Sequence, residues 1–156
     1  KPAKTIVPEV LAGHSLSLEG KTLEVIGLDG KQPDRSFVWI PSLKAVVGGV
    51  VVAENIHVWM ADTQSAQSHA DWLTTLDSIK ALQPNTLIPG HYLGDSSRSL
   101  KAVQFTADYI RAFDEETAKA NNSAELIAAM KKRYSDLGEE SSLELSAKVA
   151  KGEMQW

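Results

Sequence analysis

The chain has 156 residues and a formal net charge of −4, and this length suits one domain that buries roughly 70% of its unfolded surface. Because it contains no cysteine, disulfides, zinc–cysteine sites, iron–sulfur clusters and thiol nucleophiles are excluded. The 16 basic residues are outnumbered by 20 acidic ones, which argues against nucleic-acid binding. The longest apolar run, Ala45–Ala53, is shorter than the ~18 residues that a membrane span needs. We therefore expect a soluble protein without a nucleic-acid or membrane partner, in either the cytoplasm or the periplasm.

The first residue is Lys1 rather than methionine, and no signal-like apolar segment follows it. We therefore expect this chain to be a piece of a longer polypeptide: a processed product, an excised domain or a proteolytic remnant.

The first half of the chain predicts strands and turns. Ser15–Leu18 and Thr22–Ile26 alternate apolar and polar residues on either side of a glycine turn, which predicts a hairpin. Phe37–Ile40 and Ala45–Val52 are apolar runs whose high valine content predicts burial on both faces. Ile56–Met60 is a further strand candidate.

Helices dominate the second half. Apolar spacing predicts a helix from about Ser65 to Leu82, a short buried strand over Thr86–Ile88, and helices from Ser99 onward. This order predicts an α/β (α+β) fold, a mixed sheet covered by helices. We expect residues 1–98 to form the sheet portion with one helix and the Pro-Gly-His loop, and residues 99–156 to form helices that pack on the same domain.

His91 is the strongest candidate for chemistry. It follows the predicted buried strand in the segment Leu87–His91, at the strand end where α/β sheets gather their ligand-binding residues. A histidine on a short rigid loop suits a metal ligand or a general base. The alternative is a structural histidine that hydrogen-bonds a loop carbonyl.

Asp62 and His57 are weaker candidates. Asp62 lies where a strand gives way to a helix, so it is either a ligand or, more commonly, a helix cap. His57 lies beside Trp59 and favours a packed strand position over a metal site. His69 falls on the polar side of a first helical turn, where we expect it to be exposed.

An ordered series of segments resembles the C-terminal half of a metallo-β-lactamase-fold metallohydrolase. The resemblance runs from about Leu11 to about Tyr92, and its order and spacing carry it. The segments are Gly13–Ile26, Phe37–Pro41, Ala45–Gly49, His57–Asp62, the helix around Trp72, Leu73 and Leu76, and Leu87–His91.

The resemblance implies half of an αββα sandwich, with helices on one face of its sheet. It implies a full-length protein that hydrolyses an ester, amide, thioester or phosphoester with a metal-activated water, using zinc or another divalent metal. In that family a Pro-Gly-His supplies the last metal-binding histidine, so the resemblance makes His91 a metal ligand.

The departures from the family concern the other ligands. The His-x-His-x-Asp-His loop belongs to the N-terminal half of the family and does not occur here. The histidine before the Trp-Pro strand falls at Lys31 and the bridging aspartate at Gly49, so both positions are degenerate. Asp62 is a lookalike of that aspartate, although partial compensation stays open. We expect this chain alone to bind no metal and to be inactive, and we expect Lys31 and Gly49 to lie near His91.

Three interpretations follow. The first is the C-terminal portion of a metal-dependent hydrolase, and the second is a degenerate, non-catalytic module of the same fold used for binding or assembly. The third is an unrelated α/β domain. In the first two, one sheet face lacks cover within this chain. We therefore expect as partner either the missing N-terminal half of the polypeptide or a second copy that packs on this open face.

Overall fold

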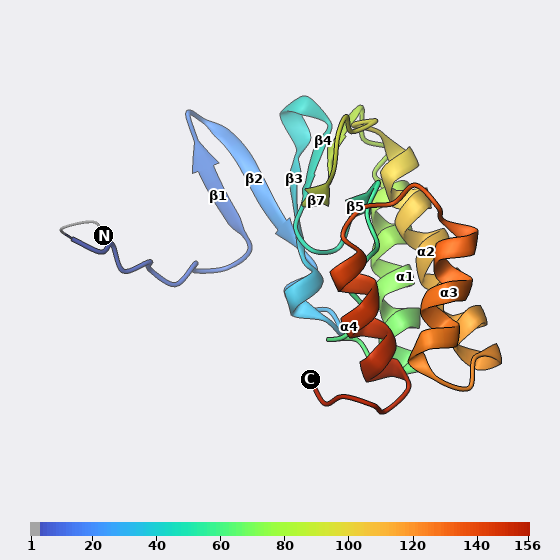
Figure 1. Ribbon diagram of the computed structural model, residues 1–156. Coiled ribbons are helices and arrows are strands. Elements are labelled where there is room, and N and C mark those ends of the chain that lie inside the picture. The colour runs from blue at the N-terminus through green and yellow to red at the C-terminus, as the bar shows by residue number, and fades with distance from the viewer. Residues whose placement is uncertain (1–3) are drawn as a thin grey trace.

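A mixed sheet with helices along one side forms the body of the protein, in a computed structural model that describes residues 4–156 (Figure 1). No helix within residues 4–156 is long and apolar enough to cross a membrane. The strands are β1 (Ser15–Leu18), β2 (Lys21–Ile26), β3 (Phe37–Ile40), β4 (Ala45–Gly48), β5 (Ala53–Glu54), β6 (Thr86–Ile88) and β7 (His91–Tyr92), and the helices are α1 (Ala66–Ala81), α2 (Leu100–Lys119), α3 (Ser123–Arg133) and α4 (Glu140–Ala150).

The main sheet has five strands in the order β1-β2-β3-β4-β6. Neighbours from β1 to β4 are antiparallel, and β4 pairs with β6 in parallel through the crossover helix α1. β5 and β7 form a separate parallel pair. The predicted α/β class with a mixed sheet is therefore confirmed, including both strands of the first hairpin.

The segment Ile56–Met60 is not a strand, so that prediction is wrong. Asn55 turns the chain with a left-handed φ of 60°, a conformation that interrupts a strand and that asparagine tolerates. The backbone beyond it finds other partners: the His57 amide donates to the Gly138 carbonyl at 2.8 Å, and the Met60 amide donates to the Ser146 hydroxyl at 2.9 Å.

The helix α1 begins after Ser65, not after Asp62. The Ser65 hydroxyl accepts from the Ser68 amide at 3.0 Å, and the Ser68 hydroxyl accepts from the Ser65 amide at 3.2 Å. This reciprocal capping box satisfies two backbone donors at the helix start. Asp62 therefore does not cap α1, although its position before the helix had favoured that role.

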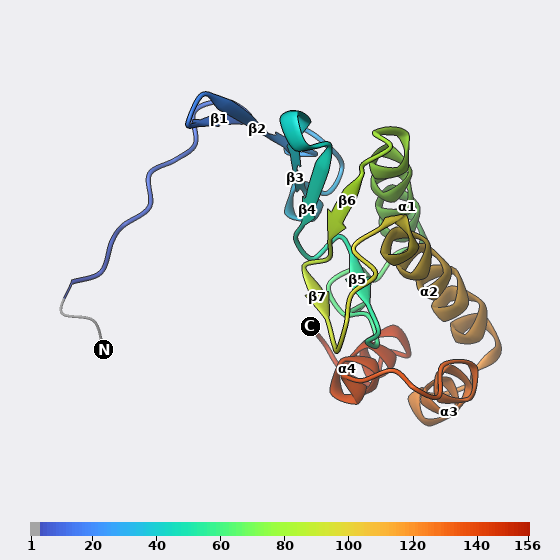
Figure 2. The same cartoon turned by 90° about the horizontal axis from the view of Figure 1, so that it is seen from above.

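One face of the sheet packs against the helices. Phe37, Val46 and Leu87 are at most 2% exposed and form one core with α1 residues such as Leu76 and Ile79. Figure 2 shows α1 and α2 together on this side of β3, β4 and β6.

The opposite face of the sheet has no helix over it in the described part of the chain (Figures 1 and 2). On this face Val47 is 39% exposed and Leu18 is 62% exposed. The prediction that Ala45–Val52 is buried on both faces therefore does not hold within this chain. We call this surface the open face; the strand register places on it the apolar residues Leu16, Leu18, Leu23, Val25, Val38, Ile40, Ala45, Val47 and Ile88, together with Lys21 and Thr86.

Candidate functional site

A cavity of about 450 Å³ lies beside β5 and β7, and its wall includes His57, Asp62 and His91. The structure thus brings all three histidine and aspartate candidates to one place, although they are up to 34 positions apart in sequence. Lys31 and Gly49 do not line this cavity.

The backbone around His91 is held on both sides. Ala53 of β5 pairs with His91 of β7, and the Gly90 amide donates to the Val52 carbonyl at 3.0 Å. Gly90 lies directly against Gly49, so that a side chain at position 90 would overlap the Gly49 carbonyl. Gly49 therefore lies against the residue that precedes His91, while proximity of Lys31 to His91 stays a prediction.

Two residues that the sequence analysis did not single out fix the loop after His91. The buried Glu54 carboxylate accepts from the Ser96 hydroxyl at 2.7 Å and from the Ser97 amide at 2.9 Å. The Asn55 amide group donates to the carbonyls of Leu93 and Asp95 at 3.2 and 3.1 Å. The signal in the sequence is a glutamate between apolar runs, because such an acid is buried only when it has partners.

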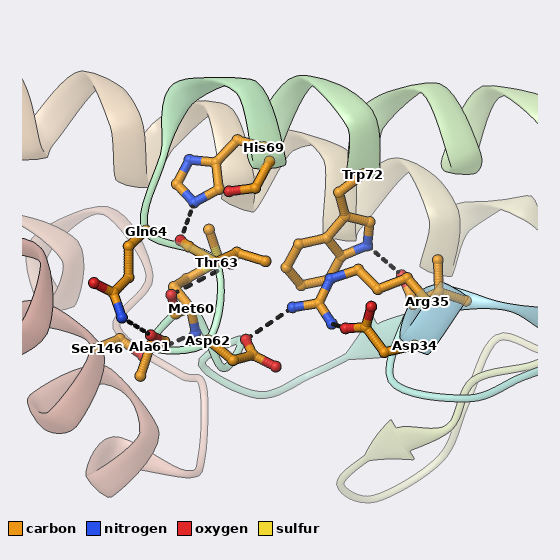
Figure 3. Close-up of polar contacts among 12 residues, drawn as sticks. Asp34, Arg35, Met60, Ala61, Asp62, Thr63, Gln64, His69, Trp72 and Ser146 are labelled. Atoms are coloured by element: carbon orange, nitrogen blue, oxygen red, sulfur yellow. Dashed lines mark hydrogen bonds and ion pairs between the residues drawn. The ribbon is translucent and has the colours of Figure 1, made fainter. Parts of the chain in front are cut away.

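Asp62 is held by a buried arginine (Figure 3). Arg35 Nη2 lies 2.8 Å from Asp62 Oδ1, and the Arg35 side chain is 1% exposed. Its guanidinium carbon lies 4.0 Å from the centroid of the Trp72 ring, a cation–π contact. The Trp72 indole in turn donates to the Val51 carbonyl at 2.8 Å. The aspartate that resembles a metal ligand therefore has a cationic partner from within the chain.

His57 is buried and hydrogen-bonded to helix α2. Its Nδ1 lies 3.0 Å from the Tyr109 hydroxyl of α2, and the residue is 1% exposed. Burial lowers the pKa of His57 and raises the pKa of Tyr109. Both side chains are therefore neutral at pH 7.

The lowered pKa of His57 predicts loss of stability in acid. The unfolded chain takes up a proton at this histidine near pH ~6.5, whereas the folded chain resists it until lower pH. The unfolded state thus binds more protons in this window, and the free energy of unfolding falls as pH decreases below ~6.5, by at most about 1.4 kcal/mol per pH unit.

Urea denaturation between neutral and mildly acid pH measures this effect. The matched variant carries His57→Phe with Tyr109→Phe, which removes both hydrogen-bonding partners and keeps the exposed carboxylates that also titrate in acid. We expect a shallower pH dependence in the double variant. Equal slopes in the two proteins would assign the acid sensitivity to other groups.

His69 is buried, so the prediction that it is exposed is wrong. Its Nδ1 lies 2.6 Å from Asp114 Oδ1 and its Nε2 lies 2.7 Å from the Thr63 carbonyl. It lies on the same side of α1 as the buried Trp72, Leu76 and Ile79, and its partner Asp114 belongs to α2, which packs against α1. His69 therefore joins the start of α1 to α2 through Asp114, and to the turn after Asp62 through Thr63 (Figure 3).

The donors at the predicted ligand positions do not fit a metal ion by themselves. Gly49 has no side chain, and Lys31 offers no donor while charged. Asp62 is paired with Arg35, and His57 uses Nδ1 for Tyr109. Within residues 4–156 no three histidine or acidic side chains form a group that could hold a metal ion.

No protein-family model and no curated protein matches the sequence. Among solved structures, a metallo-beta-lactamase family protein from Thermus thermophilus matches with a TM-score of 0.56 and 18% identity, over 97% of this chain and 51% of that chain. A metallo-beta-lactamase from Pontibacter korlensis matches with a TM-score of 0.44 and 14% identity, over 65% of this chain and 47% of that chain.

The chain thus spans about half the length of both matching structures. The likeness to the Thermus protein extends over almost all of this chain, and it agrees with the mixed sheet and one-sided helices described above. The resemblance seen in the sequence is confirmed at the level of the fold: this chain has a metallo-β-lactamase-like fold.

Proposed function

We propose that this chain is a non-catalytic metallo-β-lactamase-like module that acts in assembly through its open face. The observation that carries this proposal is the polarity of the β1–β2 hairpin. Leu16, Leu18, Leu23 and Val25 lie on the open face with one charged residue, Lys21, whereas the side toward the helices carries serine, threonine and glutamate. Alternation of this kind belongs to a strand pair whose apolar side is covered.

The partner surface that suits this face is a second β-sheet. Two sheets that pack face to face lie about 10 Å apart and interdigitate apolar side chains such as valine and leucine. An apolar patch of several hundred Å² is rarely left open on a soluble monomer. Because the chain spans about half of the matching structures, the natural source of that sheet is the rest of a longer polypeptide. A second copy takes its place when this chain is alone.

Analytical ultracentrifugation of the 156-residue chain tests the proposal. We expect a dimer or larger species, and we expect Val47→Lys to shift it toward monomer because this variant puts a charge between Val38 and Ile88 on the open face. The matched control is Thr22→Lys, which adds the same charge to an exposed residue on the other face and should sediment as the wild type does. A wild-type chain that stays monomeric at its highest soluble concentration refutes assembly through this face.

A metal-dependent hydrolase is the second candidate, and His91 is the observation that favours it. The side chain of His91 is exposed at the cavity, on a backbone that β5 and Gly49 hold in place. In this interpretation the other ligands come from residues outside this chain, and the substrate is an ester, amide, thioester or phosphoester.

Metal analysis distinguishes the two candidates. We expect the isolated chain to hold far less than one zinc per molecule after dialysis, because a stable zinc site takes three or more protein ligands. A longer polypeptide that retains stoichiometric zinc, and loses it in His91→Ala, would favour the hydrolase. Stoichiometric zinc in the isolated chain would contradict both the expectation and our interpretation of Lys31 and Gly49.

A further inference from the structure

The cavity beside β7 has the size and lining of a small-molecule site. Its volume of about 450 Å³ falls in the range of ligand pockets, which are mostly apolar with a few placed polar groups. Part of the cavity wall is buried and apolar: it is formed by Ala53, Ile56 and Val58, which are 3%, 7% and 2% exposed. Among the described residues, this wall surrounds the one buried polar group of the cavity that is not already paired with a charge, the imidazole of His57.

The hydrogen bond between His57 and Tyr109 decides which of the two ring nitrogens of His57 carries the proton. The Tyr109 hydroxyl lies on a residue that is fully buried, and its proton needs an acceptor. Nδ1 of His57, 3.0 Å away, is that acceptor. A neutral imidazole that accepts at Nδ1 carries its proton at Nε2. Within residues 4–156, Nε2 makes no hydrogen bond, so an N–H donor remains unused at the cavity wall.

The charges around the cavity disfavour an anion. The Arg35 charge is compensated by Asp62, and Glu139 adds a further negative charge to the lining. His57 is neutral, and so brings a donor without a charge. The ligand that complements this lining therefore accepts a hydrogen bond but carries no negative charge.

We propose that this cavity binds an uncharged, mostly apolar organic molecule whose carbonyl oxygen accepts a hydrogen bond from Nε2 of His57. The site requires no metal ion, and it lies apart from the open face. Its failure therefore leaves the assembly proposal intact, and the converse also holds.

Phenylacetamide and phenylacetate form a matched pair of probes, since they share a ring and a carbonyl but differ in charge. Titration of the ¹⁵N-labelled chain with each compound, followed by NMR, measures both the site and the affinity. We expect phenylacetamide to shift the signals of cavity residues, including the Trp59 indole, and to bind about tenfold more tightly than phenylacetate. Long-range ¹H–¹⁵N spectra should show His57 protonated at Nε2.

Variants identify the donor. In the His57→Phe, Tyr109→Phe double variant the cavity keeps its apolar wall and loses the N–H, so we expect phenylacetamide affinity to fall about tenfold. Thr22→Ala changes an exposed residue outside this lining and should leave the affinity unchanged. The proposal is overturned by equal or tighter binding of phenylacetate, by a His57 proton at Nδ1, or by no shift of cavity signals with either compound. If the double variant does not fold, the comparison of phenylacetamide with phenylacetate on the wild-type chain still tests the proposal.

Discussion

Trp72→Ala is expected to lower the free energy of unfolding by about 3–5 kcal/mol. The indole is 1% exposed and fills the space between α1 and the sheet. Its removal leaves a cavity, leaves the Val51 carbonyl without its 2.8 Å donor, and takes the aromatic face away from the buried Arg35 charge. Because whole domains are stable by about 5–15 kcal/mol, we expect the variant to be partly unfolded in buffer.

Urea denaturation followed by circular dichroism measures this loss, with Trp72→Phe as the matched control. Phenylalanine keeps an aromatic face for Arg35 and most of the volume, and it removes the indole N–H. We therefore expect the control to lose less than half as much stability as Trp72→Ala. Equal losses in the two variants would mean that the hydrogen bond to Val51, rather than packing, dominates at this position.

Gly90→Ala is expected to destabilise the chain by about 3 kcal/mol and to displace His91. A Cβ at this position would overlap the carbonyl of Gly49, which is backbone and cannot turn aside as a side chain can. To relieve the overlap, the strand exit after β6 must move away from β4, and this movement weakens the pairing of β7 with β5. The His91 imidazole signals and the urea midpoint should therefore change together.

Gly49→Ala is the matched control for this substitution. Its Cβ would meet only the Ser36 carbonyl, at an ordinary contact distance of 3.6 Å, so we expect a stability within about 0.5 kcal/mol of the wild type. If both variants were equally stable, the close approach of Gly90 to Gly49 would be wrong. The parallel register of β4 and β6 would then need revision.

Local sequence patterns were sufficient to predict most of the helices and strands. The alternation in Ser15–Leu18 and Thr22–Ile26 predicted the hairpin, and helical spacing predicted α1 and α2. These predictions succeed because a strand or helix that packs on one side must repeat its apolar residues with the period of its own backbone. The apolar, valine-rich runs Phe37–Ile40 and Ala45–Val52 already indicated that the sheet has a second apolar face, which the structure shows open.

The partners of polar side chains were decided by the tertiary structure. Asp62 is paired with Arg35, 27 positions away, and His57 with Tyr109, 52 positions away. His69 is buried because it lies on the side of α1 that carries Trp72 and Leu76, and its partner Asp114 on α2 is 45 positions away. The turn at Asn55 ended a strand that apolar spacing alone would have continued. Periodicity records which side of an element avoids water, but the partner of a charge depends on which distant segment the packing brings within hydrogen-bond distance.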